Sequence, residues 1–382
     1  MERREAFILL NLLPDIGPMR LQSLLSCFPD PTEILQASEE MLLRVPRLGR
    51  HCANILSNWR RYANLDEELR LCEQAGVYLV TREDRCYPRQ LLEIHDPPIC
   101  LYVRGNLAAL QCYANGISIV GSRMFSRYGE TMASSIAGDA ARSGWTVVSG
   151  LARGIDSVAH RAVVAMRGCT IAVLGSGIAQ LYPAENLPLA EQIVAGGGAI
   201  LSEFPIGMRP DKRTFPMRNR IIAGLTRGTI VVEAGLNSGS LITAAQALEQ
   251  GRTVFAVPGR ADSQLSRGCH ALLKDGARLI ESFADVQEEF LSLPSLQTQR
   301  LLREEATEYQ KPVEIAIPPA EYQVWEAVGG EPLALDDLIQ RLELPASAVL
   351  ALVLTLEVKQ LLRQLPGKRV ERIPHRTAKC LA

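Results

Sequence analysis

The middle of the chain, residues 76–290, alternates between short apolar runs and longer stretches with helical periodicity. The apolar runs are rich in valine and isoleucine, which is typical of parallel strands buried on both faces of a sheet. We expect strands at 117–120, 145–149, 170–174, 199–201, 229–232 and 253–257. Strands alternating with helices predict the α/β class, with a Rossmann-like, doubly wound and mostly parallel sheet.

The first 75 residues are predicted to form short helices. The runs "LLPDIGPMRLQSLL" and "RVPRLGRHCANIL" each place a turn with proline and glycine before an apolar helical pattern. Such a pair resembles a SAM-like or helix-hairpin-helix unit, whose glycine turn can present backbone N–H groups to phosphate. A plain helical bundle with glycine caps explains the pattern equally well.

The pattern changes again after Phe290. Residues 291–318 are polar and contain prolines, and we interpret them as a linker. Residues 319–382 follow as helix, turn, helix and two short β-like runs around "LPGK", an order that resembles a winged helix. The end of this segment is basic, with Glu371 as the one acid among Lys359, Arg363, Lys368, Arg369, Arg372, Arg376 and Lys379. Such a tail is more often solvated than functional, and contact with nucleic acid is the alternative.

Composition narrows the class of protein. The chain has 382 residues, 47% hydrophobic and 22% charged, and its net charge is −1. These values are typical of a soluble globular protein with two or three domains, here 1–75, 76–290 and 319–382. Nine scattered cysteines without a C-x-x-C pair argue against a disulfide framework and a zinc site, so we expect a reducing, cytoplasmic setting. No uncharged apolar run approaches the ~20 residues that a membrane helix needs.

The loops that follow the predicted strands gather glycines, hydroxyls and cations. They are "GSR" (121–123), "GLARGID" (150–156), "GSG" (175–177), "SEFP" (202–205), "EAGLNSGS" (233–240) and "PGR" (258–260). Ligands bind at the carboxyl ends of the strands in open α/β sheets. Ser238 or Ser240 can cap the helix after the fifth loop, and Gly239 lets a ligand approach the backbone, which together predict an anion pocket. An ordinary helix cap is the alternative.

The stretch 209–227 concentrates positive charge. Asp211 is its only acid, against Arg209, Lys212, Arg213, Arg218, Arg220 and Arg227. We interpret it as a loop that leads into a helix near Ile221, where arginines oppose the helix dipole and are suited to capturing an anion. Phe215 among the cations could stack on a base, as in single-strand binders, or pack in the core. Salt bridges to Glu203 or Glu233 are the alternative role for the arginines.

Several enzyme signatures are missing from the sequence. There is no "GxxxxGK[ST]" and no "GxGxxG" with a trailing acid, so we expect neither ATP hydrolysis nor a dinucleotide cofactor. His160 follows Asp156 by four residues on a predicted helix, and we interpret this pair as a packing contact rather than a catalytic dyad. We therefore expect no cofactor, no metal and no catalytic residue.

Runs between about 86 and 280 resemble the DNA-processing protein A (DprA/Smf) family. They include "ISIVGSR", "VVSGLARGIDSVAH", "TIAVLGSGIAQLYPAEN", "LSEFPIGMRPDKRTFPMRNRIIAGL" and "VVEAGLNSGSLITAAQALEQGRTVFAVPG". The resemblance implies a homodimer that binds and protects single-stranded DNA and loads the RecA recombinase in natural transformation. It implies a dimer surface around 250–275. The site that it implies, completed by neighbouring loop residues, is Ser122, Arg123, Lys212, Phe215, Arg218, Asn219, Arg220, Asn237, Ser238, Gly239 and Ser240.

Two other classes of function remain open. Phosphoribohydrolase-like enzymes that act on nucleotides share this type of sheet, and Glu233 lies where their carboxylate might act, although their "PGGxGT" loop is absent here. A transcription factor that binds duplex DNA through the winged helix is the other alternative.

Overall fold

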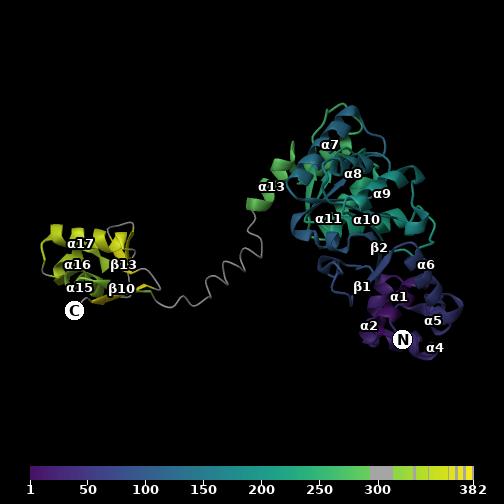
Figure 1. Ribbon diagram of the computed structural model, residues 1–382, viewed down its shortest axis with the longest axis horizontal. Helices are drawn as coiled ribbons and strands as arrows, with labels where there is room; N and C mark the ends of the chain where they lie inside the picture. Colours follow the sequence, from purple (N-terminus) through teal and green to yellow (C-terminus); the bar gives the residue numbers. More distant parts are fainter. Residues whose placement is uncertain are drawn as a thin grey trace. The chain divides into compact units, whose positions relative to one another are not determined.

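The computed structural model describes residues 1–292, 313–329, 333–342, 344–359, 361–365, 369–372 and 376–380. The chain divides into two compact units, Met1–Ser292 and Leu293–Ala382, shown in Figure 1. Most of the predicted linker lies outside the described residues.

The first unit is built on a nine-stranded sheet with the order β1-β2-β6-β5-β4-β3-β7-β8-β9. Strands β3 to β9 run parallel, and β2 pairs antiparallel with both β1 and β6. The bounds are β1 Tyr78–Thr81, β2 Cys100–Gly105, β3 Gly116–Val120, β4 Thr146–Ser149, β5 Thr170–Val173, β6 Ala199–Ser202, β7 Gly228–Val231, β8 Thr253–Ala256 and β9 Arg278–Leu279. The prediction of a doubly wound, mostly parallel sheet is confirmed, whereas β1, β2 and β9 were not predicted.

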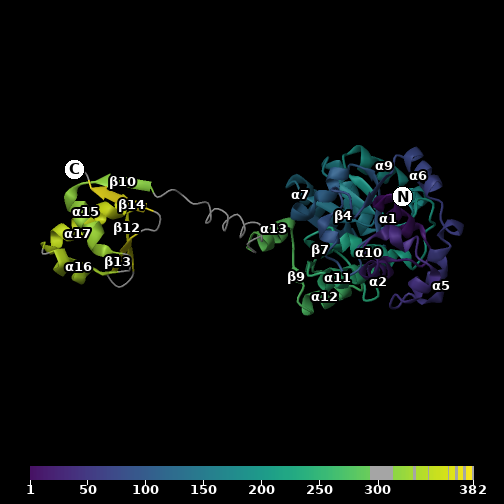
Figure 2. The same cartoon turned by 90° about the horizontal axis from the view of Figure 1, so that it is seen from below.

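Helices cover both faces of this sheet, which explains why its strands are apolar throughout. On one face pack α7 (Arg127–Arg142), α8 (Ile155–Ala165), α9 (Leu187–Ala195) and α13 (Phe283–Ser292). On the other face pack α10 (Thr214–Gly224), α11 (Gly239–Glu249) and α12 (Arg267–Lys274). Figure 2 shows the strands between these two layers. The strand order reverses between β3 and β7, so the loops after these two strands separate and leave a crevice.

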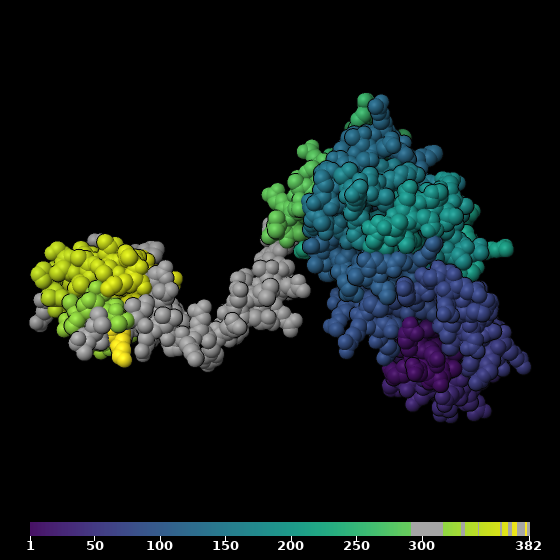
Figure 3. Space-filling view, viewed as in Figure 1, coloured from purple at the N-terminus to yellow at the C-terminus, as the bar shows by residue number. Residues whose placement is uncertain are grey.

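The N-terminal helices form a second core beside the sheet. They are α1 (Arg3–Leu12), α2 (Pro18–Cys27), α3 (Pro31–Ile34), α4 (Glu39–Leu43), α5 (Gly49–Ser57) and α6 (Leu65–Gln74). Ile8 of α1 also packs against Cys100 and Tyr102 of β2. The Asn11 amide donates to the main-chain oxygen of Glu203 at 3.1 Å. These helices are therefore seated directly on the sheet domain, as Figure 3 shows for the purple and blue surfaces.

The second unit contains α15 (Pro319–Val328), α16 (Leu335–Leu342) and α17 (Ala346–Val358), with an antiparallel sheet of order β11-β13-β12. Its strands are β10 Val313–Ile317, β11 Leu333–Ala334, β12 Leu362–Leu365, β13 Arg369–Arg372 and β14 Arg376–Cys380. Val324, Leu338 and Val353 of the three helices meet in one core with Val370 of β13. This is the predicted winged-helix arrangement.

Within the described ranges, no single helix is long and apolar enough to cross a bilayer. The bent pair α16 and α17, broken by 114°, meets the length and composition criteria only when both are taken together.

Candidate nucleic-acid interface

A trough of about 1090 Å³ opens at the reversal point of the sheet, between the loops that follow β3 and β7. Ten of the eleven predicted site residues line it: Ser122, Arg123, Lys212, Phe215, Arg218, Asn219, Asn237, Ser238, Gly239 and Ser240. They come from three segments far apart in the sequence. The strand order brings these segments to one edge of the sheet.

Arg123 follows β3 and is exposed at the edge of the trough. Its loop is held by Ser122, whose backbone N–H donates to the Glu233 carbonyl at 2.7 Å and whose hydroxyl donates to the Met124 carbonyl. Gly154 has φ +93°, and a Cβ there would lie 2.2 Å from the Ser122 carbonyl oxygen. The backbone around Arg123 is thus fixed, while its guanidinium forms no salt bridge with any residue that the structure describes.

Phe215 supplies an aromatic surface inside the trough. The Arg123 guanidinium carbon lies 5.6 Å from the centre of its ring. The Tyr182 ring lies 5.9 Å away from it on a neighbouring loop. Two rings and a cation with no carboxylate partner form a surface suited to a stacked base beside a phosphate.

The N-terminus of α11 also borders the trough. Ser238 is the N-cap, and its hydroxyl lies 2.7 Å from the Ser240 hydroxyl and 3.4 Å from the Ser240 N–H. The Asn219 amide donates to the Gly239 carbonyl at 3.5 Å, which ties α10 to this turn. The Leu241 N–H donates to the Ser238 carbonyl at 3.0 Å, so the N–H of the exposed Gly239 is the first-turn donor left open to an anion within the described residues.

Helix α10 begins at Thr214, not near Ile221 as predicted. The Thr214 hydroxyl donates to the Asp211 and Gly175 carbonyls at 2.7 and 2.5 Å, and Pro216 is tolerated because the first turn needs no intrahelical N–H donor. Phe215, Arg218 and Asn219 are therefore spaced i, i+3 and i+4 on one helical face, which is the face that lines the trough.

Arg220 lies outside the trough, and its predicted role as a ligand contact requires correction. Its side chain is 4% exposed and binds both Glu203 carboxylate oxygens, at 2.8 and 2.6 Å, and Asp96 at 2.8 Å. Burial alone would lower the pKa of Arg220, but Glu203 and Asp96 hold it above its ordinary value. Each of its three guanidinium nitrogens donates to a group of the protein, so the salt-bridge alternative applies to this residue.

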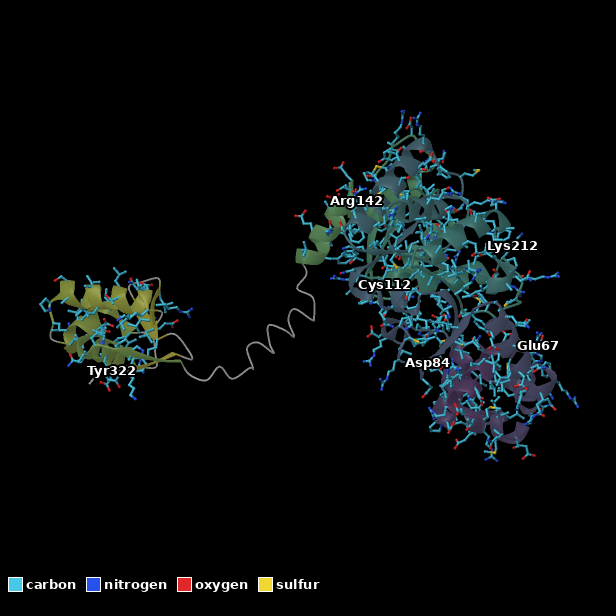
Figure 4. The ribbon with its side chains drawn as sticks, viewed as in Figure 1. Glu67, Asp84, Cys112, Arg142, Lys212 and Tyr322 are labelled. Atoms are coloured by element: carbon cyan, nitrogen blue, oxygen red, sulfur yellow. The ribbon has the colours of Figure 1, made fainter. Side chains whose placement is uncertain are left out.

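Two other cations of 209–227 are also engaged, whereas the exposed Arg209 does not line the trough. Arg213 pairs with Asp211 at 3.0 Å, and Arg227 lies 4.3 Å over the ring of Phe290. Lys212 is exposed at the margin of the unit (Figure 4) and makes no salt bridge within the described residues. The free positive charge at the trough thus comes mainly from Arg123 and Lys212, not from a cluster of six cations.

Arg218 is an intermediate case. It lines the trough but is 4% exposed, and its Nη1 donates to the Gly150 carbonyl at 2.6 Å and to the Val173 carbonyl. Its Nε is buried without a hydrogen-bond partner in the described structure. Burial lowers the pKa of Arg218 to about 10, against the attraction of Asp156, so the group remains charged at neutral pH. Arg218 therefore adds a buried positive charge beneath the trough, but its guanidinium is not exposed for direct contact with a ligand.

Asp156 and His160 make no hydrogen bond to each other within the described residues, and each is held by other groups. Asp156 accepts from the backbone N–H of Gly150 at 3.2 Å and of Ala152 at 3.4 Å. His160 is fully buried with Nδ1 2.8 Å from the Thr170 hydroxyl. Neither arrangement resembles a catalytic dyad.

Glu233, the carboxylate considered for an enzyme, is engaged in fixing α7. It accepts from the Ser126 N–H at 2.9 Å and the Ser126 hydroxyl at 2.6 Å, and it is 2% exposed. It is not among the residues that line the trough. No group of three or more histidine, cysteine or acidic side chains in the described ranges is placed to hold a metal ion.

In the second unit, three of the seven residues of the predicted basic tail make contacts within the unit. Lys359 pairs with Glu321 at 2.6 Å, Arg363 pairs with Glu371, and the Arg372 guanidinium lies 3.7 Å over Trp325. Lys368 lies outside the described residues. The outward face of α17 carries exposed Leu350, Leu354 and Val358 instead of cations.

Sequence reasoning did not assign Tyr182 or Asp156 to the trough, although both line it. Tyr182 belongs to the run "LGSGIAQLYP", and only its place after the third predicted strand could have drawn attention to it. Asp156 sits beneath the trough, and burial raises its pKa against the opposing effect of Arg218.

The fold and site define a Rossmann-like protein with a cationic, aromatic-lined trough and a C-terminal winged helix. The chain belongs to the DNA recombination-mediator protein A family, whose model matches residues 78–291. The DprA winged helix domain model matches residues 310–368.

Relatives extend this match over most of the chain. It is 39% identical to Protein Smf of Escherichia coli over 80% of each chain, and 35% identical to Protein Smf of Synechocystis over 94% of this chain and 96% of the relative. The crystal structure of DNA processing protein A from Streptococcus pneumoniae matches with a TM-score of 0.65 at 35% identity, covering 76% of this chain and 98% of that chain. The Helicobacter pylori protein, whose structure is described for its single-stranded DNA binding mode, matches with a TM-score of 0.50 at 28% identity over 56% and 96%.

Proposed function

We propose that this protein binds single-stranded DNA without sequence preference and processes DNA entering the cell by transformation. The observation that carries the proposal is the trough itself. Arg123 and Lys212 remain free of carboxylates there, beside the rings of Phe215 and Tyr182 and the open N-terminus of α11. Family membership and the single-stranded DNA binding described for the Helicobacter pylori relative support it.

Different residues of the trough would contact the phosphates and the bases of the strand. Phosphates would meet Arg123, Lys212 and the backbone N–H of Gly239, while one base stacks on Phe215 next to Tyr182. None of these contacts reads a base edge, so binding would be independent of sequence. The buried Arg218 would add attraction without ordering a flexible side chain.

Further parts of the proposal concern partners and setting. We propose a homodimer formed near residues 250–275, and exposed Leu248 and Leu279 at that end of the sheet support it. Loading of the RecA recombinase and protection of incoming DNA would follow the behaviour that the family resemblance implies. The eight cysteines whose side chains the structure describes are free thiols, which supports a reducing, cytoplasmic setting.

Replacing Arg123 by alanine should weaken binding to oligo-dT and oligo-dC alike, by about tenfold, because a charge-assisted hydrogen bond contributes roughly 1.5 kcal/mol. The slope of log affinity against log salt should fall by about 0.7, because the variant neutralises one phosphate fewer. Fluorescence anisotropy over a salt series measures both.

Arg209→Ala is the matched control, because Arg209 is a nearby exposed arginine that does not line the trough and pairs with no carboxylate within the described residues. It should bind like the unmodified protein. Equal affinity of the two variants would overturn the proposed role of Arg123.

We also propose that the protein is not an enzyme acting on nucleotides. Incubation with nucleoside monophosphates should release no free base by chromatography, since Glu233 is engaged with Ser126. Release of base that Glu233→Gln abolishes would support the phosphoribohydrolase alternative instead.

A further inference from the structure

Residues 41–64 of the N-terminal domain carry an unbalanced positive charge. The segment contains five arginines and one histidine and no aspartate or glutamate. Arg44, Arg47 and Arg50 are all exposed around the turn between α4 and α5. None of these three side chains forms a salt bridge or a hydrogen bond within the described residues. In contrast, Arg70, Arg104 and Arg142 elsewhere in the unit each bind a carboxylate.

The turn that carries these arginines is one of two with the same construction. Asp15 and Arg47 each follow a proline and have φ of 59° and 64°. The next N–H donates back three residues at 3.4 Å in both, from Ile16 to Leu13 and from Leu48 to Val45. The buried positions also correspond: Leu10, Leu13, Ile16, Leu21 and Leu24 in the first hairpin, and Leu42, Val45, Leu48, Ala53 and Leu56 in the second.

The two turns lie side by side and leave their helix ends open. The His51 ring bonds the Asp15 carboxylate at 3.2 Å, so Asp15 is already paired with a residue of the second turn. Helices α2 and α5 begin without a side-chain cap, whereas α3, α4 and α6 in the same domain are capped by Asp30, Ser38 and Asn64. The free N–H groups of both helices therefore add to the field of the arginines.

We propose that this paired-hairpin surface, residues 14–20 and 44–51, binds the phosphate backbone of duplex DNA, separately from the single-strand trough. Unpaired arginines and open backbone N–H groups are the chemistry that recognises phosphate. Neither turn contains a phenylalanine, tyrosine or tryptophan, so the surface lacks the stacking platform that single-strand binders use. A duplex shields its bases and offers phosphates on two strands, which matches two adjacent turns held in one rigid core.

The test is duplex binding by the full chain with Arg44→Gln, Arg47→Asn and Arg50→Gln combined. Asparagine is chosen at position 47 because it tolerates positive φ. Affinity for a 30-base-pair duplex should fall at least tenfold, and the salt slope should fall by about 2 to 3, as expected for three phosphate contacts. Affinity for a short oligo-dT should not change.

Two comparisons make the outcome decisive. The combined variant Arg70→Gln, Arg104→Gln and Arg142→Gln removes the same charge from paired arginines and should keep duplex affinity. Arg123→Ala should keep duplex affinity while its single-strand affinity falls by about tenfold, as predicted above, which separates this proposal from the trough. Equal duplex affinity of the two triple variants, or an equal loss of single- and double-strand binding in the first, would overturn it. The first triple variant should have the same melting temperature as the unmodified protein, because its three substituted arginines have no side-chain partner within the described residues. A matching melting temperature excludes misfolding as the cause of lost duplex binding.

Discussion

Replacing Glu203 by glutamine should lower the free energy of unfolding by about 3 kcal/mol or more. The substitution keeps the shape of the side chain but removes the negative charge that pairs with Arg220 deep beneath α10. Both partners are less than a tenth exposed, and Asp96, the second carboxylate, is itself 37% exposed. Removing one partner of a buried pair leaves an uncompensated charge, which costs about 3–5 kcal/mol. Urea unfolding followed by circular dichroism measures the change.

Glu185→Gln is the control for this experiment. Glu185 also binds an arginine in bidentate fashion, but the Glu185–Arg153 pair is more than half exposed. Such a solvent-exposed pair contributes little, so the control should leave the free energy of unfolding almost unchanged.

The double variant Glu203→Leu with Arg220→Met shows whether the pair is structural. An apolar replacement of both partners should recover most of the stability lost in Glu203→Gln. Its affinity for oligo-dT should equal that of the unmodified protein. A loss of single-strand affinity in a folded double variant would show that Arg220 contributes to DNA binding after all.

The different roles of Arg218 and Arg220 could not be predicted from the sequence alone. Both arginines belong to one charged run, and nothing in their local sequence distinguishes them. On a helix, residues two apart point roughly 200° apart, so one meets the trough and the other meets the core. Recognising Thr214 as the start of α10 would have separated them. Helical periodicity could not identify Glu203 as the partner of Arg220, because Glu203 follows β6, which belongs to another layer of the fold.

The sheet was more predictable than the site. The six central strands can be recognised in the sequence as valine and isoleucine runs, because both faces of each strand are buried. Strands β1 and β2 were not predicted, because they pair antiparallel at one side of the sheet and precede the regular alternation of strands and helices along the chain. The loops at the carboxyl ends were located correctly from strand polarity alone, and ten of the predicted residues meet there. The sequence could not identify Tyr182 as a site residue, since its contact with Phe215 depends on how two segments that are separate in the sequence lie against each other in the fold.

Stability should decline as the pH falls below about 6.5 because of His160. Burial, with a further contribution from Arg218, lowers the pKa of His160 to about 3. Thr170 donates its hydroxyl proton to the Val147 carbonyl at 2.7 Å, so the histidine Nδ1–H donates to Thr170 and the buried Nε2 is unprotonated, without a hydrogen-bond partner in the described structure. In the unfolded chain the imidazole protonates near its ordinary pKa of 6.5, whereas the folded site excludes the proton. The unfolded state therefore binds more protons between pH 6.5 and 3, and the stabilisation present above pH 6.5 is lost through that window.

The expected loss from this one group is about 2 kcal/mol between pH 7 and pH 5, at about 1.4 kcal/mol per pH unit below 6.5. Urea unfolding at several pH values measures it in the unmodified protein and in His160→Asn, whose amide can still donate to Thr170. The variant should be less stable at pH 7, because it leaves a cavity, yet its stability should depend less on pH by about that amount. His51→Asn, at an exposed histidine, should keep the full pH dependence. If His160→Asn and the unmodified protein show the same slope, the buried imidazole is not the group that titrates on unfolding.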